Sequence, residues 1–187
     1  MATHVALLRG INVGGRNKVP MAELREVVTS LGHAGVTTYI QSGNVLFTTA
    51  EDDTAKLAAA LEAAITGAFG LKSSVVVLSR DELARILDRN PYPDEPNPKL
   101  VHVVFLNGEP PPDLLERIKV AQSAAAAKGS RDTVTTIGSA LYLHTPDGFG
   151  TSELAQVLLR VLGQAGLVAT ARNLATTAKL LSLCEEQ

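Results

Sequence analysis

The order of strand-like and helix-like segments limits the fold of this chain more than any other feature of its sequence. Buried strands show short apolar and β-branched runs, whereas helices show apolar residues three or four positions apart. Residues 4–79 give the order strand, helix, strand, strand, helix, strand, in which the central pair forms a hairpin with its turn near Gly43. Residues 99–172 repeat this order, and their hairpin covers residues 132–145. The predicted fold class is therefore α+β.

The repeated order βαββαβ is the plan of the ferredoxin-like fold, so we predict a duplication of this unit, with antiparallel or mixed sheets. The first unit is expected to cover residues 1–79, and the second to cover residues 99–187, which include an additional C-terminal helix. Residues 80–98 are expected to form a connecting helix and a proline-rich loop, because four prolines in the nine residues 90–98 cannot continue a helix. A single mixed α/β sheet with a coincidental order is the alternative.

The composition argues against several classes of protein. The chain has 187 residues, of which 45% are hydrophobic and 19% charged, with a net charge of -2 at pH 7. These values argue against a disordered chain and against a polybasic nucleic-acid binder. The apolar runs are shorter than the roughly 18 to 20 residues of a membrane span. Because the first residues also lack the pattern of a signal peptide, we expect a cytoplasmic protein.

The sequence contains no closely spaced motif for a metal or a nucleophile. Its single cysteine, Cys184, cannot form an internal disulfide or a multi-cysteine metal site, and its four histidines are widely spaced. No carboxylate pair suggests a glycosidase, and Ser42 lacks the surroundings of a hydrolase nucleophile. We therefore predict no metal site. Neither a cofactor nor a reaction is indicated, and whether the protein is an enzyme stays open.

The stretch RGINVGGRNK, residues 9–18, is the first candidate ligand site. It links the first predicted strand to the first predicted helix, where glycines permit close approach and cations can bind a phosphate or carboxylate. The glycine spacing fits neither the dinucleotide fingerprint nor the P-loop, and Pro20 removes one N–H from the helix start. The alternative is a tight turn with solvated cations. The candidate residues of this stretch are Arg9, Gly10, Asn12, Gly14, Gly15, Arg16 and Lys18.

Two further polar stretches lie at the ends of predicted strands and are candidates for the same site. Their amides, hydroxyls and cations suit hydrogen bonding to sugars or phosphates, although the same residue types also form ordinary turns and helix caps. Sites in α+β folds often gather at strand ends, which favours convergence of the stretches. The candidates are Gln41, Ser42 and Asn44 in the first hairpin, and Arg172, Asn173 and Lys179 around the start of the last helix.

The motifs LLRGINVGGRNKVPMAELREVVTSLG, VTTYIQSGNVLF and ARNLATTAKLLSL resemble the bacterial family catalogued as domain of unknown function 1697. The resemblance covers nearly the whole chain and implies a two-part α+β fold of duplicated ferredoxin-like character. It also implies that the three polar stretches are hallmarks of the family, but no established activity comes with the family. The chain departs from the family pattern at Leu174, where an aromatic residue is usual, and at Ser152-Glu153, where a Ser-Lys pair is frequent.

The expected function is binding of an anionic small ligand, a nucleotide or a phosphorylated metabolite, at the glycine and arginine loop. The alternative is a nucleic-acid-binding or protein-interaction module without catalysis. RNA-recognition sheets display clustered aromatic residues, whereas this chain has four Phe, three Tyr and no Trp, and no predicted strand clusters them. Nucleic acid is therefore a less favoured partner than an anionic small molecule. A second copy of the chain, in a homodimer, is a further expected partner.

Overall fold

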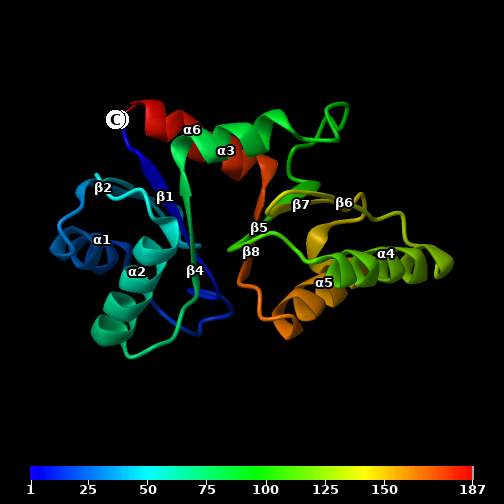
Figure 1. Ribbon diagram of the computed structural model, residues 1–187, viewed down its shortest axis with the longest axis horizontal. Coiled ribbons are helices and arrows are strands. Elements are labelled where there is room, and N and C mark those ends of the chain that lie inside the picture. Colours follow the sequence, from blue (N-terminus) through cyan, green and yellow to red (C-terminus); the bar gives the residue numbers. More distant parts are fainter. Residues whose placement is uncertain (187) are drawn as a thin grey trace. The chain divides into compact units, whose positions relative to one another are not determined.

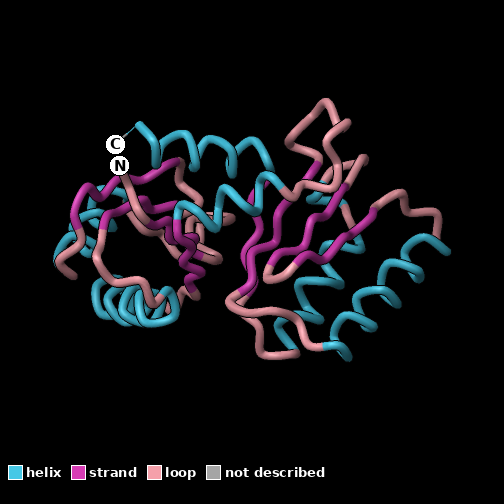
Figure 2. Tube along the Cα trace, turned by 45° about the horizontal axis from the view of Figure 1, so that its top comes forward, coloured by secondary structure: helices cyan, strands magenta, loops and turns pink. Residues whose placement is uncertain are grey.

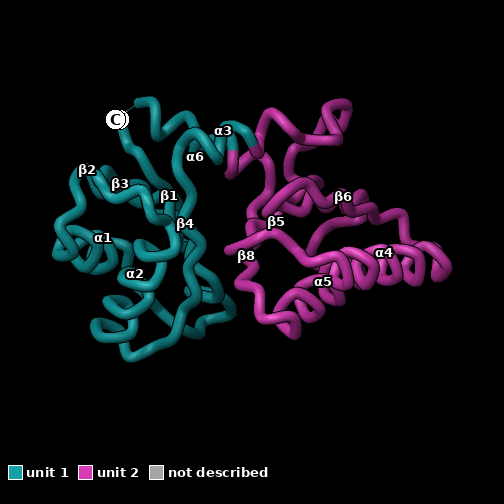
Figure 3. Tube along the Cα trace, in the orientation of Figure 1, with its two compact units in different colours: residues 1–85, 178–187 teal, residues 86–177 magenta. Residues whose placement is uncertain are grey.

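The computed structural model describes residues 1–186, which form six α-helices and two sheets of four strands each (Figure 1). The chain divides into two compact units (Figure 3). Unit 1 contains residues 1–85 together with the end of the chain from Ala178, and unit 2 contains residues 86–177. Each unit holds one of the two sheets.

Unit 1 has the order βαββαβ that the sequence predicts. Its strands lie in the order β2-β3-β1-β4, and every neighbouring pair is antiparallel. This is the strand order of the ferredoxin-like fold. The elements are β1 (His4–Leu8), α1 (Met21–Ser30), β2 (Ala34–Tyr39), β3 (Asn44–Thr48), α2 (Thr54–Phe69) and β4 (Val75–Ser79).

The core of unit 1 lies between the sheet and helices α1 and α2, which cover one of its faces (Figure 2). Alternate residues of the strands enter this core, such as Ala6 and Leu8 of β1 and Phe47 of β3. The helices contribute residues three or four positions apart, as the sequence predicts, namely Leu24, Val28, Leu57, Leu61 and Ile65. Burial of these side chains fixes the strands whose ends carry the loops described below.

Unit 2 repeats the topology of unit 1, which confirms the predicted duplication. Its antiparallel sheet has the order β6-β7-β5-β8, matching the first sheet strand for strand. A short 3₁₀-helix before α5 has no counterpart in the sequence prediction. The elements are β5 (Val101–Leu106), α4 (Pro112–Ala127), β6 (Thr133–Ile137), β7 (Ala140–His144), η1 (Phe149–Thr151), α5 (Glu153–Gln164) and β8 (Ala169–Asn173).

Two further helices, α3 (Arg80–Asp88) and α6 (Leu174–Glu186), each contain a boundary between the units. Helix α3 begins where the Glu82 N–H donates to Ser79 Oγ at 3.1 Å, and α6 begins where the Thr176 N–H donates to Asn173 Oδ1 at 2.8 Å. Both are side-chain caps of the kind that starts a helix. The proline-rich segment, residues 90–98, follows α3. Within residues 1–186, no helix has the length and apolar character to cross a membrane.

Candidate functional site

The glycine loop, residues 9–19 between β1 and α1, contains a two-residue hairpin turn. Gly14 and Gly15 have φ values of 57° and 76°, and the Arg16 N–H donates to the Val13 carbonyl at 3.0 Å. Two successive positive φ angles closed by such a bond define a type I′ turn, which glycine adopts without steric cost. Gly14 and Gly15 therefore act as turn residues, as in the tight turn that the sequence also allows.

Asparagine side chains hold the glycine loop in one conformation. Asn12 Oδ1 accepts the Val19 N–H at 2.9 Å, and Asn12 Nδ2 donates to the Val19 carbonyl at 3.0 Å and to the Gln41 carbonyl at 2.9 Å. Asn17 Nδ2 donates to the Gly10 carbonyl at 2.9 Å. Both asparagines have positive φ, which their short amide side chains tolerate better than most. The loop is therefore preorganised by its own hydrogen bonds.

The glycine loop packs against the hairpin turn, residues 40–43 between β2 and β3. The Leu8 N–H donates to the Gly43 carbonyl at 2.8 Å. A Cβ atom on Gly43 would lie 2.7 Å from Ile11 Cδ1 and 2.8 Å from Leu8 Cβ, so this approach requires glycine. Together with the bond from Asn12 to Gln41, these contacts join two of the three predicted polar stretches within unit 1.

The candidate residues of the hairpin turn differ in their exposure. Asn44 is buried, and its Nδ2 donates to the Tyr39 carbonyl at 2.9 Å and to Ser42 Oγ at 3.0 Å, so it shapes the turn. Gln41 is exposed. Ile40 has a φ of 50°, a left-handed conformation that costs a β-branched residue on the order of 1–3 kcal/mol. The turn thus combines an exposed amide with a strained apolar residue.

Three exposed cations lie on the glycine loop. Within residues 1–186, neither Arg9, Arg16 nor Lys18 forms an ion pair with a carboxylate. The backbone of Arg9 is fixed, because its N–H donates to the Ser74 carbonyl at 2.9 Å and its carbonyl accepts from Ser73 Oγ at 2.8 Å. These cations are thus available for charge-assisted hydrogen bonds to an external anion.

The start of helix α1 adds little to the attraction of an anion. Pro20 occupies the N-cap position, where it has no side-chain oxygen or backbone N–H to offer, and Glu23 places a carboxylate in the first turn. That carboxylate offsets the partial positive charge of the helix start. The positive potential of this region therefore comes from the three cationic side chains.

The third polar stretch divides between the two units. Arg172 and Asn173 belong to unit 2, where Arg172 is only 9% exposed and donates from Nη1 to Thr170 Oγ1 at 2.9 Å and to the Ala171 carbonyl at 2.8 Å. Burial lowers the pKa of Arg172 to about 10. Asn173 caps helix α6, and Lys179, in unit 1, pairs with Glu186 at 3.3 Å. Asn173 thus has the helix-capping role that the sequence allows.

A family model described as "Protein of unknown function (DUF1697)" matches residues 1–142. The chain belongs to this family. The matched range includes both the glycine loop and the hairpin turn of this DUF1697 protein. A solved structure described as that of conserved bacterial protein SP0830 from Streptococcus pneumoniae is 26% identical, covers 98% of each chain and has a TM-score of 0.69. A comparison with curated proteins gave no match.

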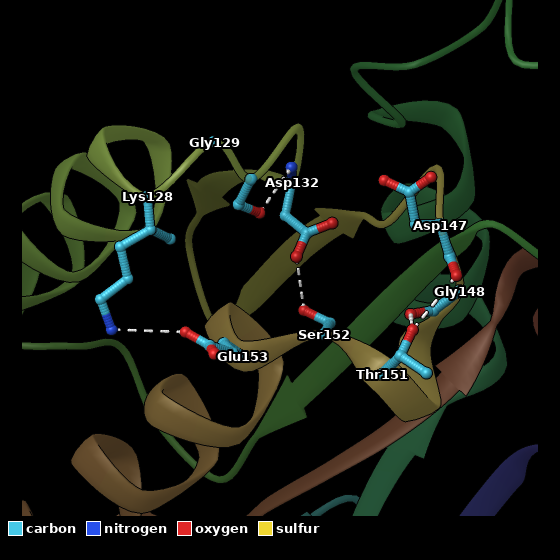
Figure 4. A pocket seen from close by; sticks show the side chains of 10 residues that line it. Lys128, Gly129, Asp132, Asp147, Gly148, Thr151, Ser152 and Glu153 are labelled. Atoms are coloured by element: carbon cyan, nitrogen blue, oxygen red, sulfur yellow. Dashed lines mark hydrogen bonds and ion pairs between the residues drawn. The ribbon is translucent and has the colours of Figure 1, made fainter.

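Unit 2 of this DUF1697 protein contains a polar hollow of about 270 Å³ at the start of α5 (Figure 4). Ser152 caps the helix by accepting the Ala155 N–H at 2.9 Å, and its hydroxyl donates to Asp132 Oδ2 at 2.7 Å. Asp132 is 7% exposed, so a buried carboxylate faces the positive end of the helix. Glu153 pairs with Lys128 at 3.4 Å. Helix capping accounts for this cluster.

Burial also shifts the pKa values of Cys184 and His102. Burial raises the pKa of Cys184 to about 11, which keeps this thiol protonated and unreactive at neutral pH. Burial lowers the pKa of His102 to about 4. Residues 1–186 contain no group of three or more histidine, cysteine or carboxylate side chains placed to hold a metal ion. The chemistry of the candidate site therefore depends on its cations and amides.

Proposed function

We propose that this protein binds an anionic small ligand that carries a phosphate group, a nucleotide or a phosphorylated metabolite, at the glycine loop of unit 1, and that it does so in the cytoplasm. The observation that carries the proposal is the set of exposed cations, Arg9, Arg16 and Lys18, on a loop whose backbone is already fixed. A hydrogen bond to a charged group contributes about 1.5–3 kcal/mol. A fixed loop adds little ordering cost on binding.

The tip of the loop leaves room for a ligand. A Cβ built on Gly10, Gly14 or Gly15 would meet no atom within 4 Å, so the backbone at these positions is approachable from outside. Backbone N–H groups of exposed glycines are good donors to phosphate oxygens. The amides of Gly14 and Gly15 would therefore complement the three side-chain cations.

The glycine loop suits binding and charge neutralisation better than acid–base chemistry. Residues 9–19 include no Asp, Glu, His, Cys, Ser or Thr, so they supply no nucleophile and no general acid or base that operates near neutral pH. If the protein acts on its ligand, this loop contributes positioning and electrostatic stabilisation. The proposal is accordingly one of ligand binding.

The proposal is tested by ligand-induced thermal shift and calorimetric titration with nucleotides and sugar phosphates. A ligand that binds the native state raises Tm in proportion to its saturation of the site. Arg9→Ala and Arg16→Ala should each weaken binding about tenfold, which corresponds to about 1.4 kcal/mol. Arg160→Ala is the matched control, because Arg160 is also exposed and forms no ion pair within residues 1–186.

One outcome would contradict the proposal, and another would change the proposed class of ligand. If no phosphate-bearing ligand raises Tm and Arg9→Ala behaves like the wild type, the glycine loop does not bind such ligands. If oligonucleotides bind with a steep salt dependence and mononucleotides do not bind, the cations bind the phosphate backbone of a nucleic acid instead. Light scattering during the same titrations would show whether the protein forms a homodimer.

A further inference from the structure

One exposed apolar side chain lies in the glycine loop, and another lies in the hairpin turn. Val13 is 67% exposed and Ile40 is 49% exposed. Within residues 1–186 the exposed large hydrophobic side chains are few, and these two lie in loops that are hydrogen-bonded to each other. The set is Met1, Val13, Leu31, Ile40 and Val120.

The hydrogen bond between Asn12 and Gln41 links the two stretches that carry the exposed apolar residues. Asn12 Nδ2 donates to the Gln41 carbonyl at 2.9 Å, Val13 follows Asn12, and Ile40 precedes Gln41. Arg16 closes the turn that begins at Val13, through the bond between its N–H and the Val13 carbonyl. The exposed apolar and cationic residues thus belong to two loops that a hydrogen bond joins.

Ile40 is an unfavourable residue for the backbone conformation at its position. Its φ of 50° lies in the region where glycine and asparagine are tolerated and β-branched residues are outliers. About half of its surface is exposed to water, so core packing only partly accounts for an isoleucine there. Strained residues of this kind often lie at ligand sites.

We infer that Val13 and Ile40 hold an apolar or aromatic group of the ligand whose anion the cations bind, so that the ligand class is a nucleotide. This inference rests on the proposed function. A nucleotide joins a flat base to a phosphate, so it can contact apolar and cationic residues of the same pair of loops together. A sugar phosphate offers only hydroxyl groups to Val13 and Ile40, and inorganic phosphate offers nothing.

The test compares the affinities of AMP and ribose 5-phosphate, which differ in the base alone. Wild-type protein should bind AMP at least about tenfold more tightly, a difference of about 1.4 kcal/mol. Val13→Ala should weaken AMP binding several-fold and leave ribose 5-phosphate unchanged. Val120→Ala, at a valine that is also 67% exposed but lies in unit 2, is the matched control.

Ile40→Gly gives a second test, because a purely structural role of Ile40 would leave the affinity for AMP unchanged. Glycine relieves the left-handed backbone strain, so Tm should rise, while AMP affinity should fall several-fold and ribose 5-phosphate affinity should stay the same. Equal affinity of wild-type protein for the two ligands, or a Tm rise without loss of AMP affinity, would overturn the inference and leave phosphate binding intact. Failure of both ligands to bind would instead reject the proposed function.

Discussion

At the scale of single residues, two glycines of the candidate site both have positive φ angles, but for different structural reasons. Gly43 has a φ of 80° and Gly14 has a φ of 57°. A Cβ on Gly43 would lie 2.8 Å from Leu8 Cβ, whereas a Cβ on Gly14 would meet no atom within 4 Å. Gly43 therefore allows close packing as well as a turn, and Gly14 allows only a turn.

This difference predicts two distinct costs of adding a methyl group. Gly14→Ala should lower the free energy of unfolding by about 1–2 kcal/mol, the cost of a left-handed backbone for an L-residue. Gly43→Ala pays that cost and also overpacks the contact with Leu8 and Ile11, which adds about 1–3 kcal/mol. Urea denaturation of both variants measures the difference. Equal losses in the two variants would mean that the loop and the turn are not in close contact.

At the scale of elements, His102 connects strand β5 to the short helix η1. Its ring stacks on Phe149, with 4.1 Å between the ring centroids and 24° between the planes. Its Nδ1 is buried and has no hydrogen-bond partner within residues 1–186, and burial lowers its pKa to about 4. The packing of η1 on β5 therefore favours a neutral imidazole.

This neutral imidazole predicts a loss of stability in acid. The pKa of His102 falls from 6.5 in the unfolded chain to about 4 in the fold, so the unfolded chain binds more protons between these values. The contribution of His102 is complete above pH 6.5 and is lost as the pH falls toward 4. His102→Phe keeps the stacking and removes the proton, so the free energy of unfolding should depend less steeply on pH.

Denaturation at several pH values from about 7 down to about 4 measures this dependence for both proteins. Part of the slope should remain in His102→Phe, because burial also lowers the pKa of His4 and of His33. An identical slope in wild type and variant would show that His102 is not the group that resists protonation. A His102→Phe variant that is less stable well above pH 6.5 would report a packing defect separately, because His102 is neutral there in both the folded and the unfolded chain.

At the scale of the whole molecule, the sequence was informative wherever a local pattern determined the structure. The two βαββαβ orders and both hairpins follow from periodicity and from turn residues that act on their own neighbours. The 3₁₀-helix at Phe149–Thr151 carries no such pattern. Element order is therefore predictable here because each element is specified locally.

The candidate site was less predictable, because its geometry depends on contacts between distant residues. The bond from Asn12 to Gln41 spans 29 positions, and nothing near Asn12 in sequence indicates it. Ile40 gave no sign of its positive φ, since isoleucine is among the residues least expected there. Arg172 and Asp132 are charged and would be placed on the surface by residue type, yet both are buried.

The end of the chain returns to unit 1, which makes the first unit discontinuous in sequence. Residues from Ala178 onward belong to unit 1, and the Ala2 N–H donates to the Cys184 carbonyl at 3.1 Å. Leu180 and Cys184 are fully buried. Buried side chains of the last helix therefore belong to the same compact unit as the first sheet.

This arrangement predicts that a substitution in the last helix destabilises the first strands. Leu180→Ala should lower the free energy of unfolding by about 2–5 kcal/mol, the usual cost of a large-to-small change in a core. Lys179→Ala, at the preceding residue, should cost only a few tenths, because its pairing with Glu186 is exposed. Hydrogen exchange should locate the Leu180 effect at the β1 and β3 amides. Faster exchange confined to residues 101–144 would contradict the assignment of this segment to unit 1.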